Sequence, residues 1–286
     1  MNGVCSEELQ TNIVRLKMTK KLSQLTLLTL GMLVMTGCEK EDKAEKDPQV
    51  FNGLVAYYTF DKGTCENQVG TLYHGLLAGG EYISDTPNGE GQALSFSEGG
   101  RVSLGGNPIS GARNYTISLW LKDFQDGVIY NTLYDQGHGG PTFVWQKSRT
   151  SLGYRFGNNN GTVDFFVNLV DQTKGRWAML TIVTSDIDKD YPGRHTLYLN
   201  GQQVGVKEDP WDCYASTGTA TLGGLIYHFG NDSKSVFLSY RTEGYPSQPF
   251  KADNLRLYNK ALSASEVTTL YQYELQKQKE KSANAK

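Results

Sequence analysis

Several classes of protein are excluded by what this sequence has little of. It has 8 prolines and 4 cysteines, and its 28 Lys and Arg are offset by 30 Asp and Glu. Because there is no surplus of positive charge, the chain lacks the electrostatic footprint of a nucleic-acid-binding protein. The apolar run at residues 25–35 is also too short for a membrane-spanning helix, which needs about 20 residues.

Aromatic residues and glycine, by contrast, are plentiful. The chain has 17 Tyr, 11 Phe and 32 Gly. Aromatic side chains favour β-strands, and glycine favours the tight turns that connect them. The composition therefore indicates a protein built mainly of strands.

The N-terminus has the pattern of an export signal. A positive start at Met18 precedes the short apolar run, as in secretory signal peptides, whereas Glu7 and Glu8 fit such a start poorly. The run ends at Cys38 in Val-Met-Thr-Gly-Cys. This ending resembles the lipobox of bacterial lipoproteins, although Met35 replaces the usual Leu. We predict a signal peptide at 1–37, with Met18 as the true start. The resemblance implies acyl chains on Cys38 that attach the protein to a membrane.

Residues 38–50 are dominated by Glu, Lys and Asp. Such a segment buries nothing and is expected to be a solvated tether. It also resembles acidic sorting tags that send lipoproteins to the outer face of the outer membrane. The segment can be a plain tether or such a sorting tag. We expect an outer-membrane lipoprotein exposed at the cell surface.

The remaining chain shows short strand patterns bounded by Gly, Asn or Asp. Residues 115–121 alternate apolar and polar positions, and Asn200-Gly201 is a hairpin turn signal. The expected strands are 54–60, 92–96, 101–104, 115–121, 128–134, 142–146, 152–156, 163–169, 177–184, 195–200, 204–206, 220–222, 236–239 and 254–258. Two packed antiparallel sheets would bury this pattern. The fold class predicted is all-β: a two-sheet antiparallel sandwich, to which the family resemblance described below adds the jelly-roll topology.

One short C-terminal helix is expected to follow the last strand. The segment from Ser263 to Glu266 forms a capping box. Val267, Leu270 and Leu275 then lie on one face. Residues 276–286 are rich in Lys and Gln and are expected to fray as a polar tail.

Six segments resemble, in order, the laminin-G-like and concanavalin A-like jelly roll of exported bacterial proteins. They are 54–61, 91–96, 115–121, 176–183, 195–201 and 253–266. The resemblance implies one such domain over residues 51–275. It does not determine the function, because this fold carries lectins, glycanases and adhesion modules.

Catalytic patterns are weak. Retaining glycosidases need two carboxyl groups about 5–5.5 Å apart, yet no strand contains the paired-acid pattern of related enzymes. Asp186, Asp188 and Asp190 fall in a hairpin loop. There is no Gly-x-Ser-x-Gly elbow, and the four His are too dispersed for a zinc pair. No catalytic residue is predicted.

Calcium is the ion that the family resemblance implies. Members often hold one Ca²⁺ near the sheet edge through the opening loop and the closing strand. Asp61 and Asp253 match these two positions, although Asn254 replaces a second acid found in many relatives. Asp253 could instead simply cap a strand end.

Aromatic residues in loops are the signal for a sugar ligand, because a sugar's apolar face stacks on an exposed ring. Trp211 and Tyr214 lie among carboxylates in one loop, and Trp211 could stack on a glycan or fold onto the sandwich. Trp145 and Tyr245 are secondary candidates. His138, flanked by glycines, could contact a ligand or lie in solvent.

Cys65 and Cys213 are the cysteines left in the mature body. Export permits a disulfide between them, and such a bond would also fix the Trp211 loop.

Two main functions from different classes, and a third alternative, fit these observations. The first is a non-catalytic surface lipoprotein that binds a glycan or a host-matrix ligand. The second is a glycan-cleaving hydrolase or lyase with an unfamiliar set of carboxylates, and a protein-binding adhesion module remains a third.

Overall fold

The computed structural model describes residues 51–125, 127–133, 142–146, 151–155, 162–186, 193–209, 219–223, 225–226, 245–246 and 248–284. Fifteen strands are present in these ranges. They are β1 (Leu54–Tyr58), β2 (Leu76–Ile83), β3 (Ala93–Ser103), β4 (Tyr115–Lys122), β5 (Gly127–Leu133), β6 (Thr142–Gln146), β7 (Ser151–Arg155), β8 (Thr162–Phe165), β9 (Ala178–Asp186), β10 (Gly193–Leu199), β11 (Gln202–Asp209), β12 (Thr219–Gly223), β13 (Leu225–Ile226), β14 (Tyr245–Pro246) and β15 (Phe250–Tyr258). The helices described are the short 3-10 turn η1 (Asp61–Gly63), α3 (Leu169–Thr173) and α4 (Ala264–Asn284).

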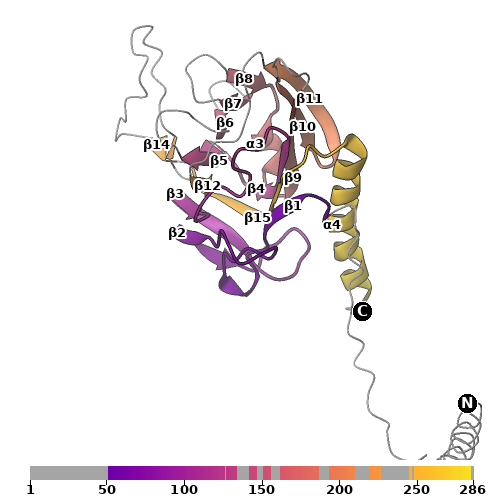
Figure 1. Cartoon of the computed structure of the whole chain (residues 1–286). Helices are drawn as coiled ribbons and strands as arrows, with labels where there is room; N and C mark the ends of the chain where they lie inside the picture. The colour runs from indigo at the N-terminus through magenta and orange to yellow at the C-terminus, as the bar shows by residue number, and fades with distance from the viewer. Residues whose placement is uncertain are drawn as a thin grey trace, which may run out of the picture. The chain divides into compact units, whose positions relative to one another are not determined.

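Thirteen of these strands form one antiparallel sheet, and β13 and β14 pair with each other separately. The order of the large sheet is β11-β10-β9-β4-β15-β3-β12-β5-β6-β7-β8, with β1 added on β15 and β2 on β3 (Figure 1). The start of β15 pairs with β3 and its end pairs with β1, while β4 pairs with β15 from Lys251 to Tyr258. A core of buried side chains from β3, β4, β9, β10, β12 and β15 lies between the two layers. The predicted all-β sandwich is confirmed.

A bulge in β15 determines which of its residues face outward. The pairing with β4 shifts between Asp253 and Arg256, and Asn254 has φ 51°. Ala252 and Leu255 both belong to the core between the layers. Because strand side chains alternate between faces, the extra residue keeps both Asp253 and Arg256 on the outer face.

Helix α4 covers part of this outer face. Val267 and Leu270 are fully buried against residues of β4, β9, β10 and β15. The predicted capping box forms, since Ser263 N–H donates to Glu266 and Glu266 N–H donates to the Ser263 hydroxyl. The helix continues to Asn284, beyond Leu275, where the sequence predicted fraying.

Three other elements differ from expectation. The predicted strands at 92–96 and 101–104 are one strand, β3, which bends at Gly99 with φ 70°. The sequence did not predict β2 or α3. Helix α3 begins where the Asn168 side chain accepts a hydrogen bond from Asp171 N–H, so local capping rather than apolar periodicity specifies it. The predicted strand at 236–239 lies outside the described residues.

The predicted hairpin turn is present between β10 and β11. Asn200 has φ 51° and Gly201 has φ 74°, the two left-handed positions of a type I′ turn. Within the described ranges, no helix has both the length and the apolar character needed to cross a membrane.

Candidate functional site

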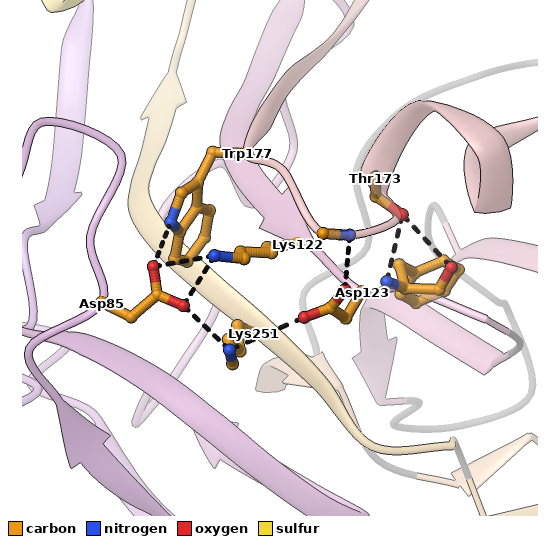
Figure 2. A network of polar contacts seen from close by, with 8 residues as sticks. Asp85, Lys122, Asp123, Thr173, Trp177 and Lys251 are labelled. Carbon is orange, nitrogen blue, oxygen red and sulfur yellow. Dashed lines mark hydrogen bonds and ion pairs between the residues drawn. The ribbon is translucent and has the colours of Figure 1, made fainter.

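A polar network lies where β4 ends and β15 begins, beside the loop that follows β2. Lys122 on β4 and Lys251 on β15 are cross-strand partners, and two like charges in this position repel each other. Asp85 lies between them (Figure 2). Its carboxylate accepts hydrogen bonds from Lys122 Nζ at 2.8 and 3.0 Å, from Lys251 Nζ at 2.8 Å and from Trp177 Nε1 at 3.1 Å. The network therefore joins two strands with the two connecting segments that carry Asp85 and Trp177.

The environment of Asp85 keeps it ionised. Its burial would raise the pKa, but hydrogen bonds from Lys122, Lys251 and Trp177 outweigh this effect and lower the pKa to about 2. The hydrogen bond to Asp85 in turn raises the pKa of Lys251. Both groups are charged at neutral pH, so Asp85 cannot serve there as a general acid.

This shift predicts a pH dependence of stability. The folded-state pKa of Asp85 is lowered from the ordinary 3.8 to about 2, so its stabilising contribution is present above about pH 4 and is lost as the pH falls toward 2. The stability difference between wild type and Asp85→Asn should therefore shrink over that interval. Urea unfolding at several pH values measures it, and a constant difference would contradict the expectation.

Asp123 extends the network toward α3. Its backbone is left-handed with φ 56°, and its N–H donates to Thr173 O at 2.8 Å. One carboxylate oxygen, Oδ1, accepts from Gly175 N–H at 2.7 Å, and the other, Oδ2, lies 3.6 Å from Lys251 Nζ (Figure 2). Asp123 is thus fixed at both its backbone and its side chain, while its side chain remains 41% exposed.

A second acidic site is formed by the two predicted calcium ligands. Asp253 is 2% exposed and accepts a hydrogen bond from Asn254 N–H at 2.7 Å. Burial raises its pKa well above the ordinary value, and the charges of nearby Asp61 and Glu274 raise it further. The fold therefore brings Asp61 and Asp253 within electrostatic reach of each other, although no three His, Cys, Asp or Glu in the described ranges are grouped to hold a metal ion.

Asp61 is also a structural residue. Its Oδ1 accepts from Gln92 N–H at 2.8 Å, and a Cβ added to Gly91 would lie 1.6 Å from that oxygen. The opening loop and the start of β3 are therefore in close contact at a glycine.

Beneath α4, a buried ion pair links the helix to the sheet. Arg256 Nη2 lies 2.5 Å from Glu274 Oε1, with side-chain exposures of 1% and 3%. The guanidinium stacks over the Tyr57 ring at 3.9 Å, and the Tyr57 hydroxyl donates to Asn254 Oδ1 at 2.6 Å. Sequence reasoning missed this pair, because only the bulge and the helix packing bring the two residues together.

The predicted ligand-binding residues are placed only in part. Trp145 lies on β6, opposite Gly127 of β5 and Leu152 of β7. Tyr245 lies on β14, opposite Ile226 of β13. His138, Trp211, Tyr214 and the lipidation residue Cys38 lie outside the described residues, so these assignments stay predictions.

Trp120, Trp177 and His195 have structural roles. Trp120 is 3% exposed, and Trp177 is half-buried beside it in the cluster under α4. His195 is fully buried, its Nδ1 lies 3.0 Å from the Thr184 hydroxyl, and burial lowers its pKa to about 3.

Of the two cysteines for which the sequence leaves a disulfide open, the structure describes only Cys65. Cys65 carries a free thiol and is buried, and its Sγ lies 3.2 Å from the Tyr82 hydroxyl. Burial raises the pKa of this thiol, which disfavours the reactive thiolate. Cys213 lies outside the described residues.

Comparison with protein families identifies the domain. The model of the concanavalin A-like lectin/glucanases superfamily (Laminin_G_3) matches residues 96–268. The chain belongs to this superfamily. The matched residues include all of β4 and β15, which carry Lys122 and Lys251 of the polar network. No curated protein matches the sequence.

Solved structures share the superfamily fold at low identity. One of them is domain 4 of AbnA, a GH43 extracellular arabinanase from Geobacillus stearothermophilus, in complex with arabinotriose. It is 19% identical to this chain with a TM-score of 0.55, and the match covers 76% of this chain and 98% of that domain. The receptor binding domain of botulinum neurotoxin D is 15% identical with a TM-score of 0.54; the match covers 79% of this chain and 54% of that one. The binding domain of Paraclostridial Mosquitocidal Protein 1 is 14% identical with a TM-score of 0.53; the match covers 78% of this chain and 52% of that one. This chain thus spans about half the length of the toxin domains.

Proposed function

We propose that this chain is a non-catalytic carbohydrate-binding lipoprotein of the cell surface. The observation that carries the proposal is the match over 98% of domain 4 of AbnA, whose structure contains arabinotriose. That domain is similar to this chain along nearly its whole length, so a domain of this size and fold is sufficient to hold an oligosaccharide.

The two carboxylates discussed above, Asp253 and Asp85, support binding rather than cleavage. A glycosidase needs a protonated acid that reaches the glycosidic oxygen. Asp253 has a raised pKa, but it is 2% exposed. Asp85 is partly exposed, but its pKa is about 2. Neither residue combines protonation with access to a polysaccharide.

A glycan array tests the proposal, with arabinotriose among neutral and acidic oligosaccharides. Wild type should bind at least one glycan, and Trp211→Ala should bind it more weakly, because loss of a stacking ring removes apolar contact with the sugar. Equal binding by both proteins would remove Trp211 from the site. Absence of binding to any glycan would contradict the proposed function and favour a protein ligand instead, as the toxin receptor binding domains suggest.

Calcium forms a further part of the proposal. Asp61 and Asp253 would hold the ion together with backbone oxygens, because Ca²⁺ takes six to eight oxygen ligands. The raised pKa of Asp253 beside Asp61 fits this role, since a cation would relieve the repulsion between the two carboxylates. If calcium binds, adding it after chelator treatment should raise the unfolding temperature of wild type but not of Asp61→Asn.

The anchor is proposed to be Cys38, followed by its charged tether at 38–50. Acyl chains there would attach the protein to the outer membrane. The tether would hold the sandwich away from the membrane surface. Labelling with radioactive palmitate should occur in wild type and disappear in Cys38→Ala. Unchanged labelling would contradict the anchor.

A further inference from the structure

Two residues of the polar network have hydrogen-bonding capacity left over. Each oxygen of Asp85 already accepts two hydrogen bonds, from Lys122 and Trp177 at Oδ1 and from Lys122 and Lys251 at Oδ2. A carboxylate offers about four acceptor sites, so Asp85 is saturated. Lys251 has three donors, of which Asp85 takes one, and Asp123 Oδ2 faces it at 3.6 Å.

These two groups present a donor beside an acceptor at the surface. Their side chains are 27% and 41% exposed, and Lys251 lies between Asp85 and Asp123 (Figure 2). A hydroxyl group is both a donor and an acceptor. One hydroxyl of a sugar can therefore accept from the ammonium group while its neighbour on the ring donates to the carboxylate.

We propose that Lys251 and Asp123 bind two adjacent hydroxyls of a neutral sugar. This contact site rests on the proposed carbohydrate-binding function. Asp85 is a positioning residue that orients Lys251. Lys122, in turn, holds Asp85 in place from the neighbouring strand.

The charge of the network indicates a neutral ligand. The positive charges of Lys122 and Lys251 are matched by the negative charges of Asp85 and Asp123. No net positive charge remains to favour a uronic acid or a sulfated sugar. Hydrogen bonds between charged protein groups and neutral hydroxyls are nevertheless stronger than those between neutral groups.

The contact pair is also held in place before any ligand arrives. Asp85 fixes the end of Lys251, while Gly175 N–H and the left-handed backbone fix Asp123. Side chains that are already ordered lose less conformational entropy on binding. This arrangement distinguishes them from an exposed pair such as Arg194 and Glu208, which are 47% and 58% exposed.

The test compares matched variants against the same ligand. Asp123→Asn preserves both the tolerance for a left-handed backbone and an oxygen for Gly175 N–H, but it removes the charge. Lys251→Met removes the ammonium group and keeps the length of the side chain. Glu208→Gln removes one charge from the exposed ion pair elsewhere on the surface and serves as the control.

Wild type is first screened on an array of neutral, uronic-acid and sulfated oligosaccharides, and the best-bound glycan is then titrated by calorimetry. A neutral glycan is expected to bind best, with affinity at least about tenfold weaker in Asp123→Asn and in Lys251→Met and unchanged in Glu208→Gln. Thermal unfolding confirms that each variant is folded. Wild-type affinity in both network variants, or a preference for acidic glycans, would overturn this site alone. Failure of wild type to bind any glycan would overturn the proposed function together with it.

Discussion

Glu274→Gln is expected to lower the free energy of unfolding by about 3–5 kcal/mol, because removing one partner leaves a buried charge uncompensated. Arg256 and Glu274 are 1% and 3% exposed. Burial lowers the pKa of Arg256, but Glu274 and neighbouring tyrosines raise it above its usual range. The guanidinium therefore keeps its charge in the variant, and its Nε already has no hydrogen-bond partner among the residues that the structure describes.

Urea unfolding of Glu274→Gln and of Glu208→Gln provides the matched comparison. Both variants remove one negative charge from an ion pair, but Arg194 and Glu208 are exposed, and exposed pairs contribute about 0–1 kcal/mol. The large loss should therefore appear only under α4. Equal, small losses in the two variants would show that the ion pair does not hold the helix on the sheet.

Gly91→Ala is expected to destabilise the fold by about 2–4 kcal/mol, through backbone strain and loss of a hydrogen bond. Gly91 has φ 68°, and a Cβ there would lie 1.6 Å from Asp61 Oδ1. The methyl group must displace Asp61, which then loses its bond from Gln92 N–H. Two separate costs thus act at one position.

Gly89→Ala separates these two costs. Gly89 has φ 75° and nothing within 4 Å of an added Cβ, so this variant suffers backbone strain alone, about 1–2 kcal/mol. Urea unfolding should rank Gly91→Ala below Gly89→Ala in stability. The double variant Asp61→Gly with Gly91→Ala should lose less unfolding free energy than the two single variants lose together. Strict additivity of these losses would exclude a contact between the added methyl group and Asp61.

The parts of the fold predicted from sequence are those specified by local patterns. Strand β4 follows the alternation at residues 115–121, the turn at Asn200 and Gly201 follows from their left-handed preference, and α4 begins at its capping box. Strand β2 was missed because it contains Gly79 and Gly80, residues that are depleted in strands. Its place depends on pairing with β3 rather than on its own composition.

The candidate site could not be predicted in the same way. Asp85 meets Lys122, Trp177 and Lys251 only after four distant segments have packed. The available signal was weak: Lys122 ends the alternating apolar pattern of β4, and its partner depends on the register between β4 and β15. Asp61 and Asp253 were identified through family resemblance, and the fold places them within electrostatic reach.

The central claim, that the domain binds carbohydrate without cleaving it, is tested most directly by one titration. Residues 38–286, produced without acylation, are titrated with the best-bound oligosaccharide from the array, and reducing ends are measured in the same solution afterwards. Saturable binding and no increase in reducing ends are the expected results. Release of reducing ends, or no heat of binding with any oligosaccharide, would contradict the claim.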